Sequence, residues 1–396
     1  MGYPGSRNPP FAGRPRFHPF DSPGDVLFSL LDAVRLNRLD PISTTGGMEG
    51  NVMFIGVSLG EKAIPAYRHV FPVNDIMRVF PVKVTVGGKP GVRVLPKWDD
   101  PRLRYCHEAG VMPFLSTKID GYGRGLDHVS EQLQEMPGWI LDDPRMVVYL
   151  TDRHEPENDD IGPDRFHNNF AAYLAMVDSL PRKIRAKIRC GPILTRTWVD
   201  DPHKGKKNWR LYDPATVGAG GDFFGGDMYV DCGTRQAVVS PATLPSPTEF
   251  TASFKAYRYD DHDNRTRLWP EFGLIGMPAD RDGSARATWI RAVYDEVSTW
   301  QAGRSGWHQP WSFGGFIWWN QKGNNTGEVA EIGGRRDFEL DERTVDSENS
   351  VKLPGSPPLP VAVFNGLIQH EHLTDRPPHA PTRAVPSDPA GRPQHT

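Results

Sequence analysis

The chain has 396 residues, a formal net charge of -3 and 38% hydrophobic residues, enough for one large domain or two ordinary ones. This nearly neutral balance provides no basic field, so we expect no nucleic-acid partner. No apolar run reaches the roughly 18 residues that a membrane span requires, and we expect no membrane insertion.

Residues 1–49 are predicted to form an N-terminal arm, rich in proline, glycine and arginine, that ends in a short amphipathic helix over 25–39. The N-terminus has no hydrophobic segment of the kind found in secretory signals. We therefore expect a cytoplasmic protein, or one that is released or virion-associated without classical secretion.

From about residue 50, short apolar runs alternate with helical patterns, as is typical of repeated βα units. The helical patterns cover 125–136, 163–180 and 283–303. The chain order predicts an α/β fold, a (β/α)8 TIM barrel over 50–325 with N- and C-terminal extensions. Residues 326–396 form the C-terminal extension, with a proline-rich tail that we expect to be disordered. The eight predicted strands lie at 52–59, 76–82, 111–117, 146–152, 187–194, 227–233, 266–272 and 314–320.

Two glutamates stand at the ends of predicted strands. Glu155 follows the fourth strand in MVVYLTDRHEPENDD, and Glu271 closes the seventh in TRLWPEFG. Catalytic groups of barrel enzymes lie at the carboxyl ends of the strands, and glycosidic cleavage needs two carboxylates. We predict that both face one pocket. In the alternative interpretation, Glu155 is a surface acid and Glu271 a buried charge paired with an arginine.

Four segments resemble glycoside hydrolase family 26, the β-mannanase family of the clan A retaining glycosidases. They are RHEPEND at the acid/base strand, GGDMYVD before the predicted sixth strand, WPEFG at the nucleophile strand and FIWWNQ at the eighth. The resemblance covers roughly residues 50–322. It implies that Glu155 is the general acid/base and that Glu271 is the nucleophile, about 5 Å away, with net retention of configuration.

The resemblance also indicates residues that contact the substrate. His154 would hydrogen-bond substrate or nucleophile, although a histidine beside a strand end is often only a structural donor. Trp318 and Trp319 are both candidates for the aromatic floor under the sugar. Side chains alternate along a strand, so only one of the two faces the cleft; the motif favours Trp319 and leaves the other in the core.

Three further residues have two interpretations each. Arg78 in the second strand and Lys118 after the third would bind sugar hydroxyls or serve as structural ion-pair partners. Trp198 would stack on a sugar or pack a loop. The family's sixth strand normally ends in a tyrosine that hydrogen-bonds the nucleophile. Here Tyr229 lies too early for that role, so we place it among the substrate-binding residues. The family's tryptophan shortly after the His-Glu pair is also missing.

Metal and cofactor chemistry has little support in the sequence. DDHDN at 260–264 and HEH at 370–372 lack the spacing of an EF-hand loop or a zinc helix, so we predict no metal and no cofactor. The three cysteines, Cys106, Cys190 and Cys232, are unpatterned and are expected to be free thiols.

Together these features predict a retaining endo-glycoside hydrolase that cleaves a β-linked polysaccharide by double displacement. The substrate would be β-mannan-like or a bacterial surface glycan. The alternative is a non-catalytic carbohydrate-binding barrel that serves as a structural or adhesive component of a larger assembly. The missing tyrosine and the absent export signal favour that alternative. The oligomeric state is not predicted.

Overall fold

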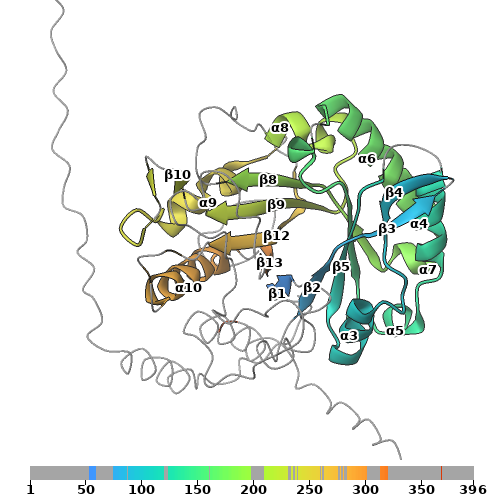
Figure 1. Ribbon diagram of the computed structural model, residues 1–396, viewed down its shortest axis with the longest axis horizontal. Coiled ribbons are helices and arrows are strands. Elements are labelled where there is room, and N and C mark those ends of the chain that lie inside the picture. The colour runs from blue at the N-terminus through green and yellow to red at the C-terminus, as the bar shows by residue number, and fades with distance from the viewer. Residues whose placement is uncertain are drawn as a thin grey trace, which may run out of the picture. The chain divides into compact units, whose positions relative to one another are not determined.

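The protein is described here by a computed structural model (Figure 1). By chain contacts it divides into residues 1–49 and 50–396. All described residues belong to the second unit, so the predicted arm, its helix and the predicted proline-rich tail lie outside them. The structure describes residues 53–58, 75–86, 88–119, 124–159, 161–197, 209–230, 233–234, 237–238, 240–258, 260, 263–274, 277, 280, 283–300, 313–319 and 367.

The main sheet contains nine strands, and every pair of neighbours in it is parallel. The first strand of this sheet pairs with the last. The other strands pair with their neighbours in chain order, except that β7 and β8 do not pair with each other. Around the sheet the order is β7, β6, β5, β2, β1, β13, β12, β9, β8. The strands are β1 Phe54–Ser58, β2 Ile76–Val79, β5 Met112–Thr117, β6 Val148–Asp152, β7 Ile188–Cys190, β8 Ile193–Thr197, β9 Phe223–Val230, β12 Thr266–Leu274 and β13 Phe313–Trp319.

The two edge strands of this sheet are the two halves of one barrel strand. Only Gly191 and Pro192 separate β7 from β8, and β7 pairs with β6 while β8 pairs with β9. Gly191 donates to the Leu150 carbonyl at 3.1 Å, and the Pro192 carbonyl accepts from Gly225 at 2.9 Å. A Cβ on Gly191 would lie 2.3 Å from the Phe223 carbonyl oxygen, so glycine is required at this junction. The ring therefore closes, and the fold is a (β/α)8 barrel.

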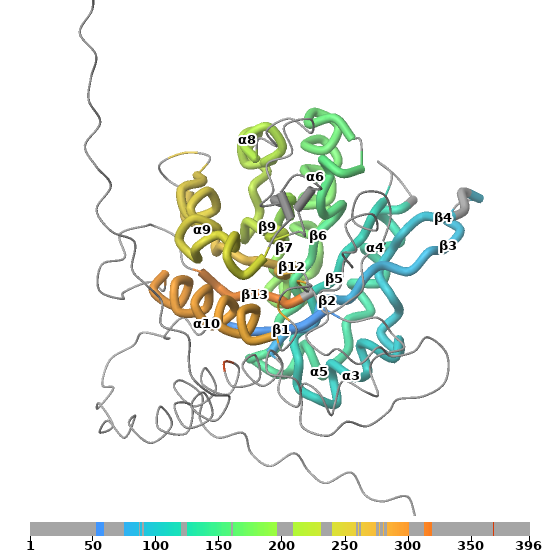
Figure 2. The backbone as a smooth tube through the Cα atoms, turned by 60° about the vertical axis from the view of Figure 1, so that its left-hand side comes forward, coloured from blue at the N-terminus to red at the C-terminus, as the bar shows by residue number. Residues whose placement is uncertain are grey.

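The connecting segments carry the helices, which lie outside the ring of strands (Figures 1 and 2). An antiparallel hairpin, β3 (Val82–Val86) and β4 (Lys89–Val94), is inserted directly after β2; the sequence analysis did not predict it. A second small hairpin consists of β10 (Gly233–Thr234) and β11 (Ala237–Val238). The helices are α3 Pro101–Ala109, α4 Arg124–Gln134, α5 Gly138–Leu141, α6 Pro163–Asp178, α7 Arg182–Arg185, α8 Trp209–Tyr212, α9 Pro247–Ala256 and α10 Ser284–Ser298, with 3₁₀ turns η2 Pro156–Asn158 and η3 Pro214–Val217.

Apolar side chains form two separate buried clusters. The larger lies between the sheet and the helices, and the smaller fills the barrel. In β2, Ile76 belongs to the inner cluster, and Arg78, two residues later on the same face, lies above it toward the carboxyl end. The Arg78 guanidinium lies 4.7 Å from the centroid of the Phe114 ring. The inner cluster consists of Phe54, Ile76, Phe114, Ile193, Phe223, Leu268 and Ile317.

The predicted strands are found in order, and the sixth differs most. It spans Phe223–Val230, not 227–233, because residues 223–226, which the prediction left outside the strand, are already paired with β8 and β12. Cys106 and Cys190 are buried free thiols, whereas Cys232 lies outside the described residues. None of the described helices has the length and apolar character needed to cross a bilayer.

Candidate active site

Glu271 enters the barrel because β12 is irregular at this point. Strict alternation from the inward-facing Leu268 would turn Glu271 outward. The pairing of β12 shifts register against both neighbours between Leu268 and Phe272. As a result Trp269 and Phe272, three residues apart, both pack in the outer cluster, and Glu271 points into the barrel. A bulge that re-aims one side chain is common beside active sites.

Glu155 reaches the same place through a left-handed turn. After β6 the backbone of Arg153 has φ 50° and that of Glu155 has φ 56°, values that are uncommon outside glycine. The Glu155 amide donates to the Ile193 carbonyl at 2.9 Å, and the Glu157 carboxylate accepts from the Thr195 amide. These two contacts fix the turn to β8. Strain of this kind is found where surrounding structure over-determines it, often at functional sites.

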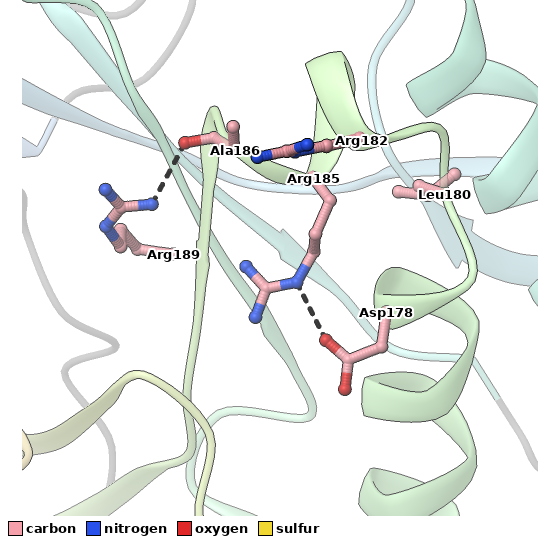
Figure 3. Close-up of a pocket in the computed structure, with 6 residues that line it drawn as sticks. All are labelled: Asp178, Leu180, Arg182, Arg185, Ala186 and Arg189. Carbon is pink, nitrogen blue, oxygen red and sulfur yellow. Dashed lines mark hydrogen bonds and ion pairs between the residues drawn. The ribbon is translucent and has the colours of Figure 1, made fainter.

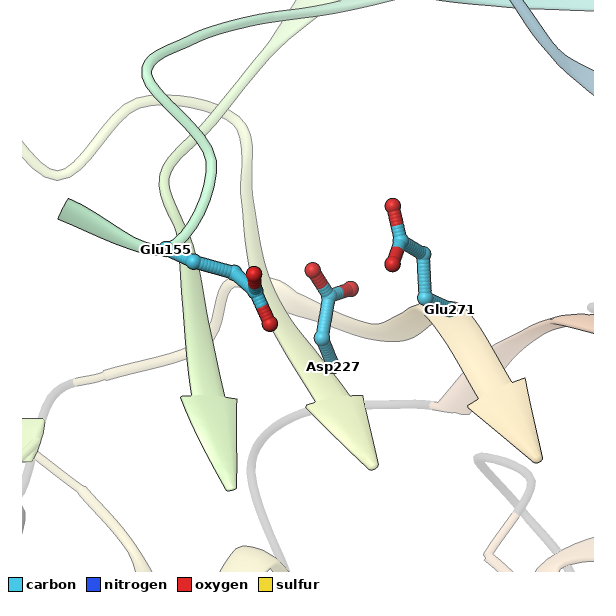
Figure 4. Close-up of side chains that lie close together, drawn as sticks. All are labelled: Glu155, Asp227 and Glu271. Atoms are coloured by element: carbon cyan, nitrogen blue, oxygen red, sulfur yellow. The ribbon is translucent and has the colours of Figure 1, made fainter. Parts of the chain in front are cut away.

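A third carboxylate, Asp227 of β9, lies between the two glutamates (Figure 4). One oxygen of each of the three lies within 4.8 Å of the others. We call Glu155, Asp227 and Glu271 the carboxylate trio. The predicted pair thus does converge. Asp227 was missed as a site residue, although the signal was present in the GGDMYVD segment. The predicted sixth strand began at Asp227 and so placed it at the amino end of the strand, whereas β9 begins four residues earlier, at Phe223.

Glu271 is 4% exposed and contacts three side chains. The Arg78 Nη2 lies 3.7 Å from its Oε1, and the His154 Nε2 lies 4.0 Å from the same oxygen. The Tyr229 hydroxyl donates to its Oε2. Burial raises the pKa of Glu271 to about 7, while the Arg78 charge opposes this rise and the Glu155 charge adds to it. The arginine partner expected in the alternative interpretation is therefore present, but so are two further carboxylates.

Asp227 is completely buried, and neither of its oxygens has a hydrogen-bond partner among the described residues. Burial, followed by the charges of Glu271 and Glu155, raises its pKa well above the usual range. The Glu271 charge opposes ionisation of Asp227 beside it, so these two carboxyl groups are not both ionised near neutral pH. The trio therefore retains at least one proton near neutral pH.

The position of Tyr229 corrects the sequence-based assignment. Because β9 ends at Val230, Tyr229 stands at the carboxyl end of the sixth barrel strand and bonds Glu271. The tyrosine that the family resemblance places beside Glu271 is thus present. Burial, followed by the Glu271 charge, raises the pKa of Tyr229, so its hydroxyl remains a donor.

His154 lies between the trio and the hairpin. Its ring meets that of Phe80 edge-on at 5.7 Å. Burial, then the charges of Arg78, Lys118 and Arg93, lower its pKa well below the usual value. His154 is therefore neutral at physiological pH and contacts Glu271 as a polar group without a charge.

Of the three tryptophans predicted to bind substrate, only Trp318 has a described side chain. Trp318 is fully buried, with its ring 5.1 Å from that of Phe272. This placement contradicts the candidate substrate-binding role of Trp318 and agrees with the alternation argument that puts it in the core. The side chain of Trp319 and the whole of Trp198 lie outside the described residues.

The trio is also the only carboxylate-rich cluster in the described part of the chain that could hold a metal ion. Arg78, 3.7 Å from Glu271, would repel a cation there. In the DDHDN segment, Asp263 instead forms ion pairs with Arg265 at 3.0 Å and Arg267 at 2.6 Å. The described part of that segment is thus a structural ion-pair site.

No protein-family model and no curated protein matches the chain. Solved structures that resemble it include an endo-β-1,4-mannanase from Thermotoga petrophila, at 10% identity over 83% of this chain and 78% of that chain, with TM-score 0.40. Xylanase 10B from Thermotoga maritima is 8% identical over 81% and 96%, with TM-score 0.47. A GH113 β-1,4-mannanase is 10% identical over 81% and 99%, with TM-score 0.35. These neighbours are glycoside hydrolases. Identities near 10% leave the side-chain geometry of the site as the basis for a functional assignment.

Proposed function

We propose that the protein is a retaining β-glycosidase that cleaves a polysaccharide by double displacement. The observation that carries the proposal is the separation of Glu155 and Glu271, which bring carboxylate oxygens within 4.8 Å of each other from different strands. Carboxyl groups about 5–5.5 Å apart are typical of retaining enzymes, whereas inverting enzymes separate them by about 6.5–9.5 Å to admit a water.

In the first step Glu271 attacks the anomeric carbon as Glu155 donates its proton to the leaving oxygen. The glycosidic bond breaks, and a glycosyl ester forms on Glu271. Arg78 and Tyr229 favour the ionised form of the nucleophile because both offer positive charge or a proton to its oxygens. Asp227, whose pKa is raised by burial and by the Glu271 charge, holds a proton within the trio.

In the second step Glu155, now ionised, removes a proton from water as the water attacks the same carbon. The ester bond to Glu271 breaks, and the sugar leaves with its original configuration. Glu155 regains its proton. The fixed turn that carries Glu155 keeps its carboxyl group in reach of both the leaving oxygen and the incoming water.

The resemblance to family 26 supplies the finer part of the proposal, an endo-acting, β-mannanase-like enzyme. Its GGDMYVD segment contributes both Asp227 and Tyr229, and the Tyr229 contact with Glu271 removes one of the two reasons for favouring a non-catalytic barrel.

The test is hydrolysis of β-mannan, β-glucan, xylan and bacterial surface polysaccharides, followed by proton NMR. The β-anomer should appear first in the products, before mutarotation. An α-anomer appearing first would overturn the retaining mechanism. Glu155→Gln should lose on the order of 10²–10⁴-fold in rate, the usual contribution of a general acid. Near-normal activity in that variant would overturn its assignment.

A further inference from the structure

A group of cations lies on the His154 side of the trio, at the carboxyl ends of the third and fourth barrel strands. Lys118 directly follows β5 and Arg153 directly follows β6. Arg93 comes from β4 of the inserted hairpin. We call Arg93, Lys118 and Arg153 the cationic rim. None of its members was selected as an anion-binding residue from the sequence.

The backbone holds the first two members together. The Lys118 amide donates to the Arg93 carbonyl at 2.8 Å, and the two residues form an antiparallel bridge. Residues directly opposite in an antiparallel pair have their side chains on the same face. Two like charges directly opposite each other destabilise such a pair, so the arrangement is unfavourable for folding alone.

The two members of the rim that face each other, Arg93 and Lys118, differ in their acidic partners among the described residues. Asp159 accepts from Lys118 at 3.0 Å and also pairs with Arg153 at 3.5 Å. Arg93 is half-buried and has no ion pair with any described carboxylate. The Lys118 side chain is only 15% exposed. Arg93, a half-buried cation without a counter-charge in the described part of the chain, would interact strongly with an anion that arrives from outside, because little solvent screens it. Lys118 stands beside it with a single carboxylate partner that it shares with Arg153.

The charges reach the reacting groups. Arg93 and Lys118 both contribute, after burial and Arg78, to the low pKa of His154. Lys118 also acts on Glu271. The cationic rim therefore borders the site at which a sugar chain would be cleaved.

We infer that the polysaccharide bound at this site carries anionic groups, and that Arg93 and Lys118 bind them beside the cleaved sugar. The inference rests on the proposed glycosidase function, which it narrows from polysaccharides in general to acidic ones. Carboxylate and sulfate groups offer the same chemistry, oxygens with a negative charge that accept from guanidinium and ammonium donors.

A second basic region, at the amino ends of the strands, provides a matched control. An open hollow there is lined by Asp178, Leu180, Arg182, Arg185, Ala186 and Arg189 (Figure 3). Its central arginine, Arg185, is neutralised by Asp178 at 2.7 Å and Asp222 at 3.2 Å. Arg182 and Arg189 form no ion pair in the described part of the chain, so replacing both removes the same charge as replacing Arg93 and Lys118.

The experiment is affinity electrophoresis of the full-length Glu271→Gln protein in gels that contain glucomannan, and it measures how strongly each of three forms of the polymer retards the protein. One is unmodified, one is oxidised to carboxylate at C6 and one is sulfated. We expect at least one anionic form to bind 5-fold or more tightly than the neutral form, with weaker binding at 0.5 M NaCl. Adding Arg93→Gln and Lys118→Gln should abolish the preference, while Arg182→Gln with Arg189→Gln should leave it intact. Lys118→Arg, which keeps the charge, should retain it.

Equal binding of all three polymers, or no binding of either anionic form, would overturn the inference. So would an anionic preference that survives loss of Arg93 and Lys118, or one that disappears with Arg182 and Arg189. Circular dichroism checks that the variants are folded. If the Arg93→Gln, Lys118→Gln double variant is unfolded, each single variant is measured in its place. The two proposals fail separately. Anion binding through Arg93 and Lys118 without cleavage of any polymer would remove the glycosidase assignment, whereas cleavage without anionic preference would remove only the inference.

Discussion

Buried charges lie at both ends of the barrel strands. Those at the amino ends are neutralised by ion pairs, whereas those at the carboxyl ends are mostly of one sign. Arg265 directly precedes β12. It donates two hydrogen bonds to Asp213, at 2.6 and 3.0 Å, and Asp213 also accepts one from the Tyr257 hydroxyl at 2.8 Å. Asp263 pairs with Arg265 and Arg267. At the carboxyl ends, three carboxylates face one close guanidinium, that of Arg78.

The difference shows what each cluster contributes. A buried pair with complete hydrogen bonding fixes the chain, and breaking it is costly. In the trio, by contrast, like charges are held together without complete neutralisation, and the pKa values of Asp227 and Glu271 are raised. Such an arrangement reduces stability and provides groups that exchange protons near neutral pH.

The largest expected effect is on catalysis. Glu271→Gln should lower the rate by on the order of 10⁴-fold or more, as loss of a nucleophile does elsewhere, because no glycosyl ester can form. The free energy of unfolding should stay equal or rise. Steady-state hydrolysis together with urea denaturation would measure both, and a large loss of stability would contradict the contrast.

The reverse result is expected for Asp213→Asn. It leaves Arg265 with half of its counter-charge, and the free energy of unfolding should fall by about 3 kcal/mol. Activity of the folded fraction should be unchanged. The control is Asp295→Asn, which breaks an exposed pair with Arg291 and should cost under about 1 kcal/mol. Similar losses in both variants would show that the buried network contributes no more to the free energy of unfolding than an exposed ion pair does.

Stability should also depend on pH through the trio. The folded pKa of Glu271, about 7, exceeds its ordinary value of 4.5. The folded state therefore binds more protons than the unfolded state within this window, and its stability falls as pH rises from 4.5 to 7. Glu271→Gln removes that term, so its advantage over the native protein should grow by on the order of 2–3 kcal/mol between pH 4.5 and 8. Melting curves at several pH values would test this, and a constant difference would contradict it.

The smallest effect is expected for Tyr229→Phe. The hydroxyl favours ionised Glu271, so its loss should raise the acidic pKa of the pH–rate profile and lower the rate roughly 10-fold. Tyr149→Phe is the control, since Tyr149 stacks on Phe114 inside the barrel and, within the described part of the chain, does not bond to the trio. An unchanged acidic limb in Tyr229→Phe would show that this hydrogen bond does not set the ionisation of Glu271.

Strand identity was predictable because each strand is a short apolar run. The prediction was weakest where side-chain type and backbone conformation disagree. Gly225 and Gly226 were left outside the predicted sixth strand, whereas in β9 they are strand residues at which a Cβ would come within 3 Å of a neighbouring side chain. This displaced the predicted sixth strand, concealed Asp227 and made Tyr229 look misplaced.

The two glutamates were predictable as residues and their directions were not. Alternation cannot indicate that the β12 bulge turns Glu271 inward, because the bulge arises from pairing with β9 and β13. The left-handed Arg153 and Glu155 likewise have side chains that usually avoid this conformation. Contacts with β8, distant in sequence, hold them there. The anionic preference inferred for the cationic rim also depends on such a contact, that between Arg93 and Lys118.

The divided fifth strand has one more consequence. Glu155 belongs to the half of the chain that ends at β7, whereas Asp227 and Glu271 belong to the half that begins at β8. The bonds that orient the Glu155 turn, to Ile193 and Thr195, cross this seam. Neither half alone contains a complete reaction centre. If the chain were divided at this point, the proposed hydrolysis would require the two fragments to reassociate. Activity of the mixed fragments would therefore show that the barrel had closed.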